Sequence, residues 1–148
     1  MDSIESALKS SGCDYELILH ENPIHTAQEG ADYFTIEIGQ TAPTLILKTD
    51  KGYLAVTFSG DRKRVDFAEI ANLVGCKHVQ LATKKEVKQI TGCEIGSVPM
   101  VGLALPFVLD KQLLRYPFVY GGSGQANRTL KIAPNALQQL NNVVVVWG

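Results

Sequence analysis

One helix-start pattern occurs three times in this chain and divides it into short elements. In each case a capping residue, threonine or aspartate, precedes a glutamate by three positions. The three pairs are Thr26 and Glu29, Asp66 and Glu69, and Thr83 and Glu86. The cap side chain accepts a hydrogen bond from a free backbone N–H of the first turn, and the glutamate reaches back to the N–H of the cap. Gly75 and Gly92 follow two of these segments, where glycine takes the left-handed conformation that ends a helix. We therefore predict three short helices that begin at these caps.

The segments between and beyond these helices predict β-strands. Residues 44–48 and 53–58 flank Asp50-Lys51-Gly52, which is a strong hairpin signal. The valine run at residues 143–146 predicts a strand that is buried on both faces. Further strands are predicted at residues 15–19, 78–81, 107–109, 118–120 and 129–132, with a first helix over 4–10 and a last one over 134–140. Hairpins mixed with short helices predict an α+β fold. We expect residues 1–148 to form a single domain around one curved, mixed and mostly antiparallel sheet of six or more strands, flanked by the helices.

Composition limits the classes of function. The chain has 148 residues and a formal net charge of -1, from 14 lysines and arginines against 15 aspartates and glutamates. A protein that holds long nucleic acid by charge needs a clear basic excess, so this class is excluded. Because 45% of the residues are apolar, burial offsets the entropy cost of ordering the chain, which excludes intrinsic disorder. An enzyme or a small-ligand-binding domain remains.

Targeting signals and cysteines predict a compartment. The N-terminal segment has neither the basic nor the apolar region of a secretory signal, and no apolar run approaches the ~20 residues of a membrane helix. The cysteines, Cys13, Cys76 and Cys93, are odd in number and lack CxxC spacing, which argues against a disulfide framework. We therefore expect a cytoplasmic protein without a membrane partner.

Two glycine-containing loops are candidate sites. In residues 92–102, Gly96 allows a backbone to approach closely and Pro99 stiffens the turn, so several N–H groups would point at a carbonyl or phosphate oxygen. A plain connection between helix and strand fits the same spacing. In residues 121–128, a run of glycines before Arg128 fits either a backbone nest for an anion or a flexible surface loop. It is not a Walker motif, because no Lys-Ser/Thr pair follows.

The histidines and one cysteine are further candidates. His20 and His25 are five residues apart across a turn that contains a proline. This spacing differs from that of two metal ligands on one face of a helix, so we expect no metal and no cofactor. His25 directly precedes the Thr26 cap and lies either in a pocket or in solvent. Cys93 stands beside the first loop. With no cation or base nearby in the sequence, a buried, unreactive thiol is favoured over a nucleophile.

Several segments, taken in order, carry a resemblance to a known family. They are His25-Thr26-Ala27-Gln28-Glu29, Thr44-Leu45-Ile46-Leu47-Lys48, Ser59-Gly60-Asp61-Arg62, residues 73–77 and 82–87, Thr91-Gly92 with Gly96-Ser97-Val98-Pro99 and Gly102, Val119-Tyr120-Gly121-Gly122-Ser123-Gly124, and Leu130-Lys131-Ile132. In their order and spacing they resemble the YbaK/prolyl-tRNA synthetase-associated domain family, the trans-editing aminoacyl-tRNA deacylases. The resemblance covers nearly the whole chain.

The resemblance implies hydrolysis of the ester that joins a mischarged small amino acid to the 3′ end of a tRNA, without a metal or cofactor. It implies a mischarged tRNA as partner, with prolyl-tRNA synthetase as a second one. Backbone N–H groups of the loop at Gly96, Ser97 and Val98 would stabilise the oxyanion, and Lys48 is the candidate catalytic cation. The amino acid, among Cys, Ala, Ser and Thr, and the oligomeric state stay open. The expected substrate-binding residues are His25, Thr26, Pro99, Gly102, Gly121, Gly122, Ser123 and Arg128.

One position departs from the family pattern. Well-studied members have a lysine directly before the Thr-Leu of the first hairpin strand, and this chain has Pro43 there. Lys48 is five residues further along, and residues at odd separations on a strand face opposite sides. Three functions are therefore open. They are a deacylase, a non-catalytic module that binds the tRNA end or an aminoacyl-adenosine, and a thiol enzyme that pairs Cys93 with His20 or His25.

Overall fold

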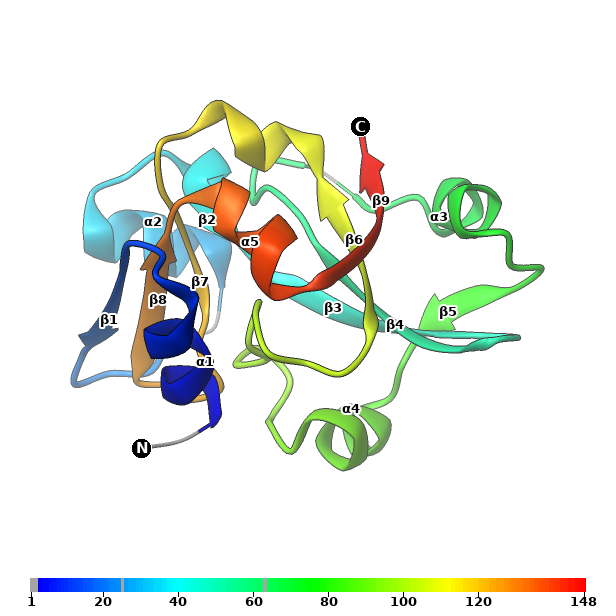
Figure 1. Ribbon diagram of the computed structural model, residues 1–148, viewed down its shortest axis with the longest axis horizontal. Helices are drawn as coiled ribbons and strands as arrows, with labels where there is room; N and C mark the ends of the chain where they lie inside the picture. Colours follow the sequence, from blue (N-terminus) through cyan, green and yellow to red (C-terminus); the bar gives the residue numbers. More distant parts are fainter. Residues whose placement is uncertain (1–2, 25, 63) are drawn as a thin grey trace.

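Two mixed β-sheets form the centre of the computed structural model, which describes residues 3–24, 26–62 and 64–148 (Figure 1). The 4-stranded sheet has the order β1 (Tyr15–Leu19), β8 (Arg128–Ile132), β7 (Val119–Gly122) and β2 (Thr41–Ala42). The 5-stranded sheet has the order β5 (Val79–Leu81), β3 (Thr44–Thr49), β4 (Gly52–Thr57), β6 (Pro106–Asp110) and β9 (Asn142–Trp147). The predicted α+β fold and the hairpin of β3 and β4 are confirmed. The strands, however, form two sheets instead of one.

The two sheets separate at Pro43, which joins β2 to β3. β2 runs parallel to β7, while β3 pairs antiparallel with β4 and β5. Proline has no backbone N–H and cannot donate to a ladder, so the pairing pattern is interrupted at this residue. The strands that β1 and β2 pair with come late in the chain. Local patterns do not specify partners so distant in sequence, which is why the division was not predicted.

The helices begin and end where their capping residues predict. The side chains of Thr26, Asp66 and Thr83 accept from backbone N–H groups of the first turn. The α-helices are α1 (Ser3–Ser11), α2 (Ala27–Phe34), α3 (Phe67–Val74), α4 (Lys84–Thr91) and α5 (Pro134–Leu140), and the 3-10 helices are η1 (Ile38–Gln40) and η2 (Lys111–Arg115). α2 ends at Thr35, which takes the left-handed conformation without being a glycine. Among the described helices, none combines the length and apolar content that crossing a bilayer requires.

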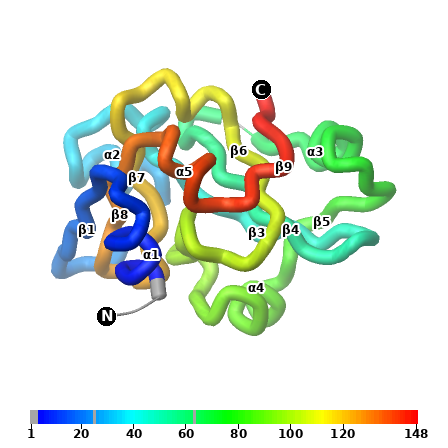
Figure 2. The backbone as a smooth tube through the Cα atoms, in the orientation of Figure 1, coloured from blue at the N-terminus to red at the C-terminus, as the bar shows by residue number. Residues whose placement is uncertain are grey.

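The two sheets are covered differently. In the 5-stranded sheet, Ile46 and Phe107 pack on the side of α4, while their sequence neighbours Leu47 and Val108 pack on the side of α3. Figure 2 shows the tubes of α3 and α4 flanking this sheet. The 4-stranded sheet buries one face against α1 and α5. On its other face, α2 contacts β2 and the remaining surface is open to solvent.

Strand β9 is not buried on both faces, contrary to the sequence prediction. It lies at the edge of the 5-stranded sheet, where Val144 and Val146 are 49% and 45% exposed. Val143 and Val145 are half-buried, and Trp147 is buried. An uninterrupted valine run carries no alternation that would reveal an exposed face. The pattern therefore could not distinguish an edge strand from a central one.

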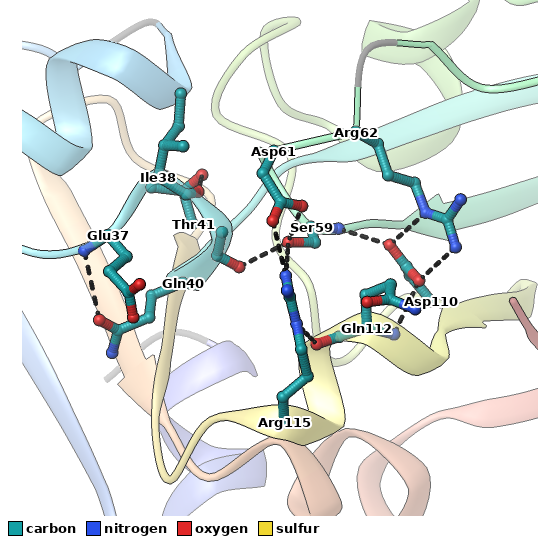
Figure 3. Close-up of polar contacts among 11 residues, drawn as sticks. Glu37, Ile38, Gln40, Thr41, Ser59, Asp61, Arg62, Asp110, Gln112 and Arg115 are labelled. Carbon is teal, nitrogen blue, oxygen red and sulfur yellow. Dashed lines mark hydrogen bonds and ion pairs between the residues drawn. The ribbon is translucent and has the colours of Figure 1, made fainter.

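A buried ion pair ties the loop after β4 to the end of β6. The Asp110 carboxylate is fully buried and accepts from Arg62 Nε at 2.6 Å and from Arg62 Nη2 at 2.8 Å (Figure 3). The backbone N–H groups of Ser59 and Gln112 donate to the same carboxylate. The Arg62 guanidinium lies 3.8 Å from the centroid of the Trp147 ring. Both members of the pair are therefore hydrogen-bonded, with Asp110 fully enclosed and Arg62 partly buried.

Asp110→Asn should destabilise the fold strongly. It removes the charge that neutralises Arg62, a loss on the order of 3 kcal/mol in the free energy of unfolding. Urea unfolding followed by circular dichroism measures the change. Arg64→Gln is the control, because its side chain is 82% exposed and its 3.9 Å pair with Asp66 is a surface pair, worth about 0–1 kcal/mol. Equal unfolding midpoints for the two variants would contradict this role of Asp110.

Candidate functional site

A cavity of about 240 Å³ lies at the junction of the two sheets. Its walls come from α2, from the chain on either side of Pro43, from residues 95–98, from β7 and from the start of β8. Most lining residues are apolar or carry hydroxyl groups. Among the described lining residues, Arg128 alone has a charged side chain. The cavity is therefore suited to a ligand that is held by shape and by neutral hydrogen bonds.

The loop over residues 95–98 brings backbone donors to the cavity. Gly96 has φ 90°, a conformation that favours glycine. The Ser97 N–H is used within the loop, because it donates to the Glu94 carbonyl at 3.1 Å. Within the described part of the chain, the N–H groups of Gly96 and Val98 donate to no protein acceptor, although both residues line the cavity. Two such donors suit a carbonyl oxygen that gains negative charge during a reaction.

Gly121 and Gly122 are closely packed backbone positions in β7, which corrects the expectation of a flexible surface loop at this point. A Cβ on Gly122 would lie 1.9 Å from the Val98 carbonyl oxygen. A Cβ on Gly121 would lie 2.6 Å from the Ala42 carbonyl oxygen. The two glycines therefore allow β7 to approach both β2 and residues 95–98, which we call the donor loop, and this approach defines one wall of the cavity.

A histidine and a threonine that are 109 residues apart form a second polar group at the cavity. His20 Nδ1 lies 2.7 Å from the Asn22 carbonyl oxygen, which only accepts, so Nδ1 carries the proton. Nε2 lies 3.0 Å from Thr129 Oγ1, and in the tautomer that carries its proton on Nδ1 the threonine hydroxyl donates to Nε2. Both side chains are buried, and Thr129 lines the cavity. The oxygen of Thr129 thus retains lone pairs for a ligand or a water.

The structure brings part of the predicted site together. Predicted residues that line the cavity are Thr26, Gly96, Ser97, Val98, Gly121, Gly122 and Arg128. Predicted residues outside the lining are Lys48, Pro99, Gly102 and Ser123. His25 lies outside the described residues. Sequence reasoning missed Phe34, Tyr120 and Thr129, which also line the cavity. They lie in a helix and two strands with no unusual local pattern, so only their neighbours in space identify them.

Arg128 and Thr26 have partners within the protein. Arg128 is 5% exposed, and its Nη1 pairs with Glu5 Oε1 at 3.0 Å, while its Nη2 donates to the Ser123 carbonyl at 2.8 Å. The cation expected for an anion nest is therefore already paired. The Thr26 hydroxyl accepts from the Glu29 N–H as the cap of α2. Arg128 therefore supports the cavity wall from inside the fold, whereas Thr26 lies at its exposed edge.

Lys48 lies outside the cavity, at the far end of the hairpin strand from Pro43. A strand rises about 3.3 Å per residue, so five residues separate the two positions by about 16 Å. The Lys48 ammonium pairs with Glu86 at 3.2 Å, and Tyr53 donates to the same carboxylate at 2.5 Å. Pro43 itself lines the cavity. Lys48 therefore does not take the place of the lysine that the family pattern leads us to expect.

Cys93 is half-buried, which corrects the expectation of a buried thiol. Its thiol lies 3.6 Å from the Thr91 carbonyl oxygen, and the residue does not line the cavity. The ring nitrogens of His20 are engaged by Asn22 and Thr129 instead of by Cys93. In the three described ranges, no three His, Cys, Asp or Glu side chains gather as metal ligands would. The structure therefore brings no Cys93–His20 pair together.

Glu86 predicts a pH-dependent contribution to stability. The Thr83 N–H, above all, and the Tyr53 hydroxyl lower the pKa of Glu86 to about 2. A lowered pKa means that the carboxylate stabilises the fold above its ordinary pKa, and that this stabilisation is lost as the pH falls toward 2. The urea midpoints of the wild type and Glu86→Gln should differ most above about pH 5 and converge as the pH falls toward about 2. Glu94→Gln is the control, because that side chain is 75% exposed. A difference that grows at low pH would contradict this assignment.

Comparison with known families gives a match over most of the chain. A family model described as an aminoacyl-tRNA editing domain matches residues 21–140. The proline–tRNA ligase of Caldicellulosiruptor saccharolyticus is 26% identical over 108 residues, which is 73% of this chain and 19% of the ligase. The proline–tRNA ligase of Desulforamulus reducens is 37% identical over 90 residues, which is 60% of this chain and 16% of the ligase. The chain thus spans less than a fifth of the length of these ligases.

Solved structures share the two-sheet fold. A protein described as hypothetical in its crystal structure superposes with a TM-score of 0.90 and 32% identity, over 99% of this chain and 98% of that chain. A candidate trans-editing enzyme for prolyl tRNA synthetase superposes with a TM-score of 0.87 and 31% identity, over 98% of this chain and 93% of that chain. The similarity therefore includes both sheets and nearly the whole length of each protein.

Proposed function

The chain belongs to the aminoacyl-tRNA editing domain family, and we propose that it acts in trans to hydrolyse the ester joining a mischarged small amino acid to the 3′ end of a tRNA. The observation that carries this proposal is the pair of N–H donors from Gly96 and Val98, which have no acceptor among the described residues and belong to a loop that lines the cavity. The similarity to proline–tRNA ligases and to a candidate trans-editing enzyme supports a tRNA charged by prolyl-tRNA synthetase as the substrate. The three free cysteines support a cytoplasmic setting.

The donors act on the charge that develops during hydrolysis. A water oxygen attacks the ester carbonyl carbon, and the carbonyl oxygen becomes an oxyanion. When this intermediate collapses, the bond to the ribose oxygen breaks, and that oxygen takes a proton from the attacking water. The products are a free amino acid and a tRNA with a free 3′ end. The Gly96 and Val98 N–H groups donate to the oxyanion, and one such donor contributes ~3–4 kcal/mol in other enzymes.

Thr129 is placed to orient the attacking water. Its own proton is donated to His20 Nε2, so its oxygen accepts from the water. The bond between His20 Nδ1 and the Asn22 carbonyl holds the ring in the tautomer that this arrangement needs. The terminal ribose hydroxyl of the substrate would hold the water from its other side. Hydrolysis then proceeds with neutral groups around the ester.

The size of the cavity supports a small amino acid. Its volume is about 240 Å³, below the roughly 300–1,000 Å³ of pockets that hold drug-sized ligands. Phe34 and Leu45 contribute bulky apolar walls. A methyl-sized difference in such a pocket changes binding by ~1–3 kcal/mol. A survey of tRNAs charged with Cys, Ala, Ser and Thr would therefore separate the candidate substrates.

Pro43 favours a second candidate function, a non-catalytic module that binds the tRNA end or an aminoacyl-adenosine. Pro43 brings no charge to the cavity, and Arg128, the cation among the described lining residues, is paired with Glu5. Such a module would bind a non-hydrolysable aminoacyl-adenosine analogue in a calorimeter and leave the corresponding ester uncleaved. Binding accompanied by cleavage selects the deacylase, and binding without cleavage selects the module.

Gly96→Ala should reduce deacylation about 100-fold or more. At φ 90° an added Cβ strains the backbone, so the loop shifts and its donors lose their alignment. Gly12→Ala is the matched control, because Gly12 has φ 71° and no atom within 4 Å of such a Cβ. Lys48→Gln changes a residue outside the cavity and should retain wild-type turnover. The activity of all three variants is measured as the release of labelled amino acid from several charged tRNAs. Full activity of Gly96→Ala, or a folded wild type that cleaves none of these tRNAs, would exclude the proposal.

Thr129→Val should lower kcat about 100-fold while KM changes little, because the water loses its acceptor. Valine has nearly the shape of threonine, and circular dichroism would show whether the fold is kept. Thr129→Ser restores the hydroxyl and should recover most of the activity. A wild-type kcat for Thr129→Val would remove this residue from the mechanism.

A further inference from the structure

Aromatic side chains continue from the cavity onto the surface of the 4-stranded sheet. Phe34 of α2 and Tyr120 of β7 both line the cavity, with ring centroids 5.0 Å apart. The ring centroid of Tyr33 lies 4.9 Å from that of Phe34, and Tyr33 is 56% exposed. These ring contacts form a continuous path from a cavity wall to solvent.

A lysine and a further ring extend this path along the sheet. Lys131 Nζ lies 4.8 Å from the ring centroid of Phe118 and 5.8 Å from that of Tyr120. Lys131 is also the cross-strand partner of Tyr120, so the two side chains stand on the same face of the sheet. We call Tyr33, Phe34, Phe118, Tyr120 and Lys131 the aromatic strip.

The aromatic strip lies on the face of the sheet that the hydrophobic core does not use. Val119, Leu130 and Ile132 alternate with strip residues along β7 and β8, and they are buried in the cluster that includes α1 and α5. Side chains of adjacent strand residues point to opposite faces. Burial in the core therefore does not account for the aromatic residues of the strip.

The end of α2 holds two rings of the strip in place. Thr35 ends the helix directly after Tyr33 and Phe34, with φ 55°. A β-branched residue is uncommon in this left-handed conformation. The Thr35 N–H donates to the Ala31 carbonyl and closes the last turn. The chain thus maintains an unfavourable conformation directly after the two rings, of which Phe34 lines the cavity and Tyr33 is exposed.

We propose that the aromatic strip binds the unpaired nucleotides that precede the terminal adenosine of a tRNA. Bases stack on the rings of Tyr33 and Phe118, and a phosphate lies beside Lys131. The proposal rests on the deacylase function, because that function places the ester of the terminal adenosine at the cavity that the strip adjoins. Every base has a π face, so aromatic side chains bind single-stranded RNA largely without regard to sequence.

Continuity with the cavity favours RNA over a protein partner. A tRNA end that reaches the donor loop carries its preceding nucleotides past Phe34 and Tyr120, which line the cavity and begin the strip. Lys131 adds a cation beside the rings, which complements a phosphate. The strip has only five side chains, whereas a stable protein interface buries roughly 1,200–2,000 Å². Its size and chemistry suit a few nucleotides.

The kinetic test compares a full substrate with one that lacks the preceding nucleotides. KM and kcat are measured for aminoacyl-tRNA and for the aminoacyl ester of adenosine alone. In Tyr33→Ala the KM for aminoacyl-tRNA, divided by the KM for the adenosine ester, should rise about tenfold, because one stacked base is lost. The kcat for aminoacyl-tRNA should stay unchanged. Tyr33→Trp keeps a stacking ring and should restore the ratio. Leu19→Ala is the matched control, because Leu19 is 71% exposed on the same sheet but outside the strip.

A binding test separates this proposal from the deacylase function. Fluorescence anisotropy is measured with a short labelled RNA that ends in unpaired CCA. Tyr33→Ala and Lys131→Gln should both bind it more weakly than the wild type, and Lys131→Gln should reduce the salt dependence by about one phosphate contact. Such losses of binding in a protein that hydrolyses neither substrate would support the strip and exclude the deacylase.

Two results would overturn the aromatic strip as an RNA site. The first is equal binding of the RNA by the wild type and both variants, or no binding at all, even where aminoacyl-tRNA is hydrolysed. The second is unchanged RNA binding together with a weakened complex with prolyl-tRNA synthetase, which would assign the strip to a protein partner instead.

Discussion

The buried Asp110 carboxylate fixes the loop that supports one wall of the cavity. It binds the backbone N–H of Ser59 and the side chain of Arg62, so the chain between these residues is held at both ends. Within this segment the Gly60 N–H donates to the Thr41 carbonyl at 2.9 Å, and Thr41 lines the cavity. A Cβ on Gly60 would lie 1.9 Å from Thr41 Oγ1, so only glycine permits this approach. The junction of the two sheets therefore depends on an ion pair that does not itself touch the cavity.

Charged groups near the junction neutralise one another, and this leaves the cavity to neutral donors. Arg115 pairs with Asp61 at 2.7 Å, which lowers the pKa of Asp61, and Arg128 pairs with Glu5 (Figure 3 shows the first pair). The N–H groups of the donor loop are fixed by the fold and need no reorganisation when charge develops on a substrate. Pro43 agrees with this arrangement, because it shapes the cavity without adding charge. A site of this kind is suited to stabilising an oxyanion through oriented dipoles.

Interactions between residues close in sequence were predictable, and those between distant residues were not. The cap at Thr83 involves residues three positions apart, so the sequence specifies it directly. Gly96 was recognised because glycine marks positions where backbones approach closely, whereas the close approach at Gly122 was not predicted. The bond between His20 and Thr129 joins residues 109 positions apart, and no local pattern indicates it. The division into two sheets was missed for the same reason, since the partner of a strand is chosen by the whole fold.

Under the proposed function, this nearly neutral chain must divide affinity and selectivity for tRNA between different surfaces. With a net charge of -1 it gains little from the phosphate backbone as a whole. Under the proposed function, affinity comes from the aromatic strip and from the end of the tRNA at the cavity. The unpaired end is common to all tRNAs, so stacking on Tyr33 and Phe118 raises affinity without distinguishing one tRNA from another. Discrimination between amino acids must then arise in the cavity, where Phe34 and Leu45 limit the space and where each methyl group is worth only ~1–3 kcal/mol.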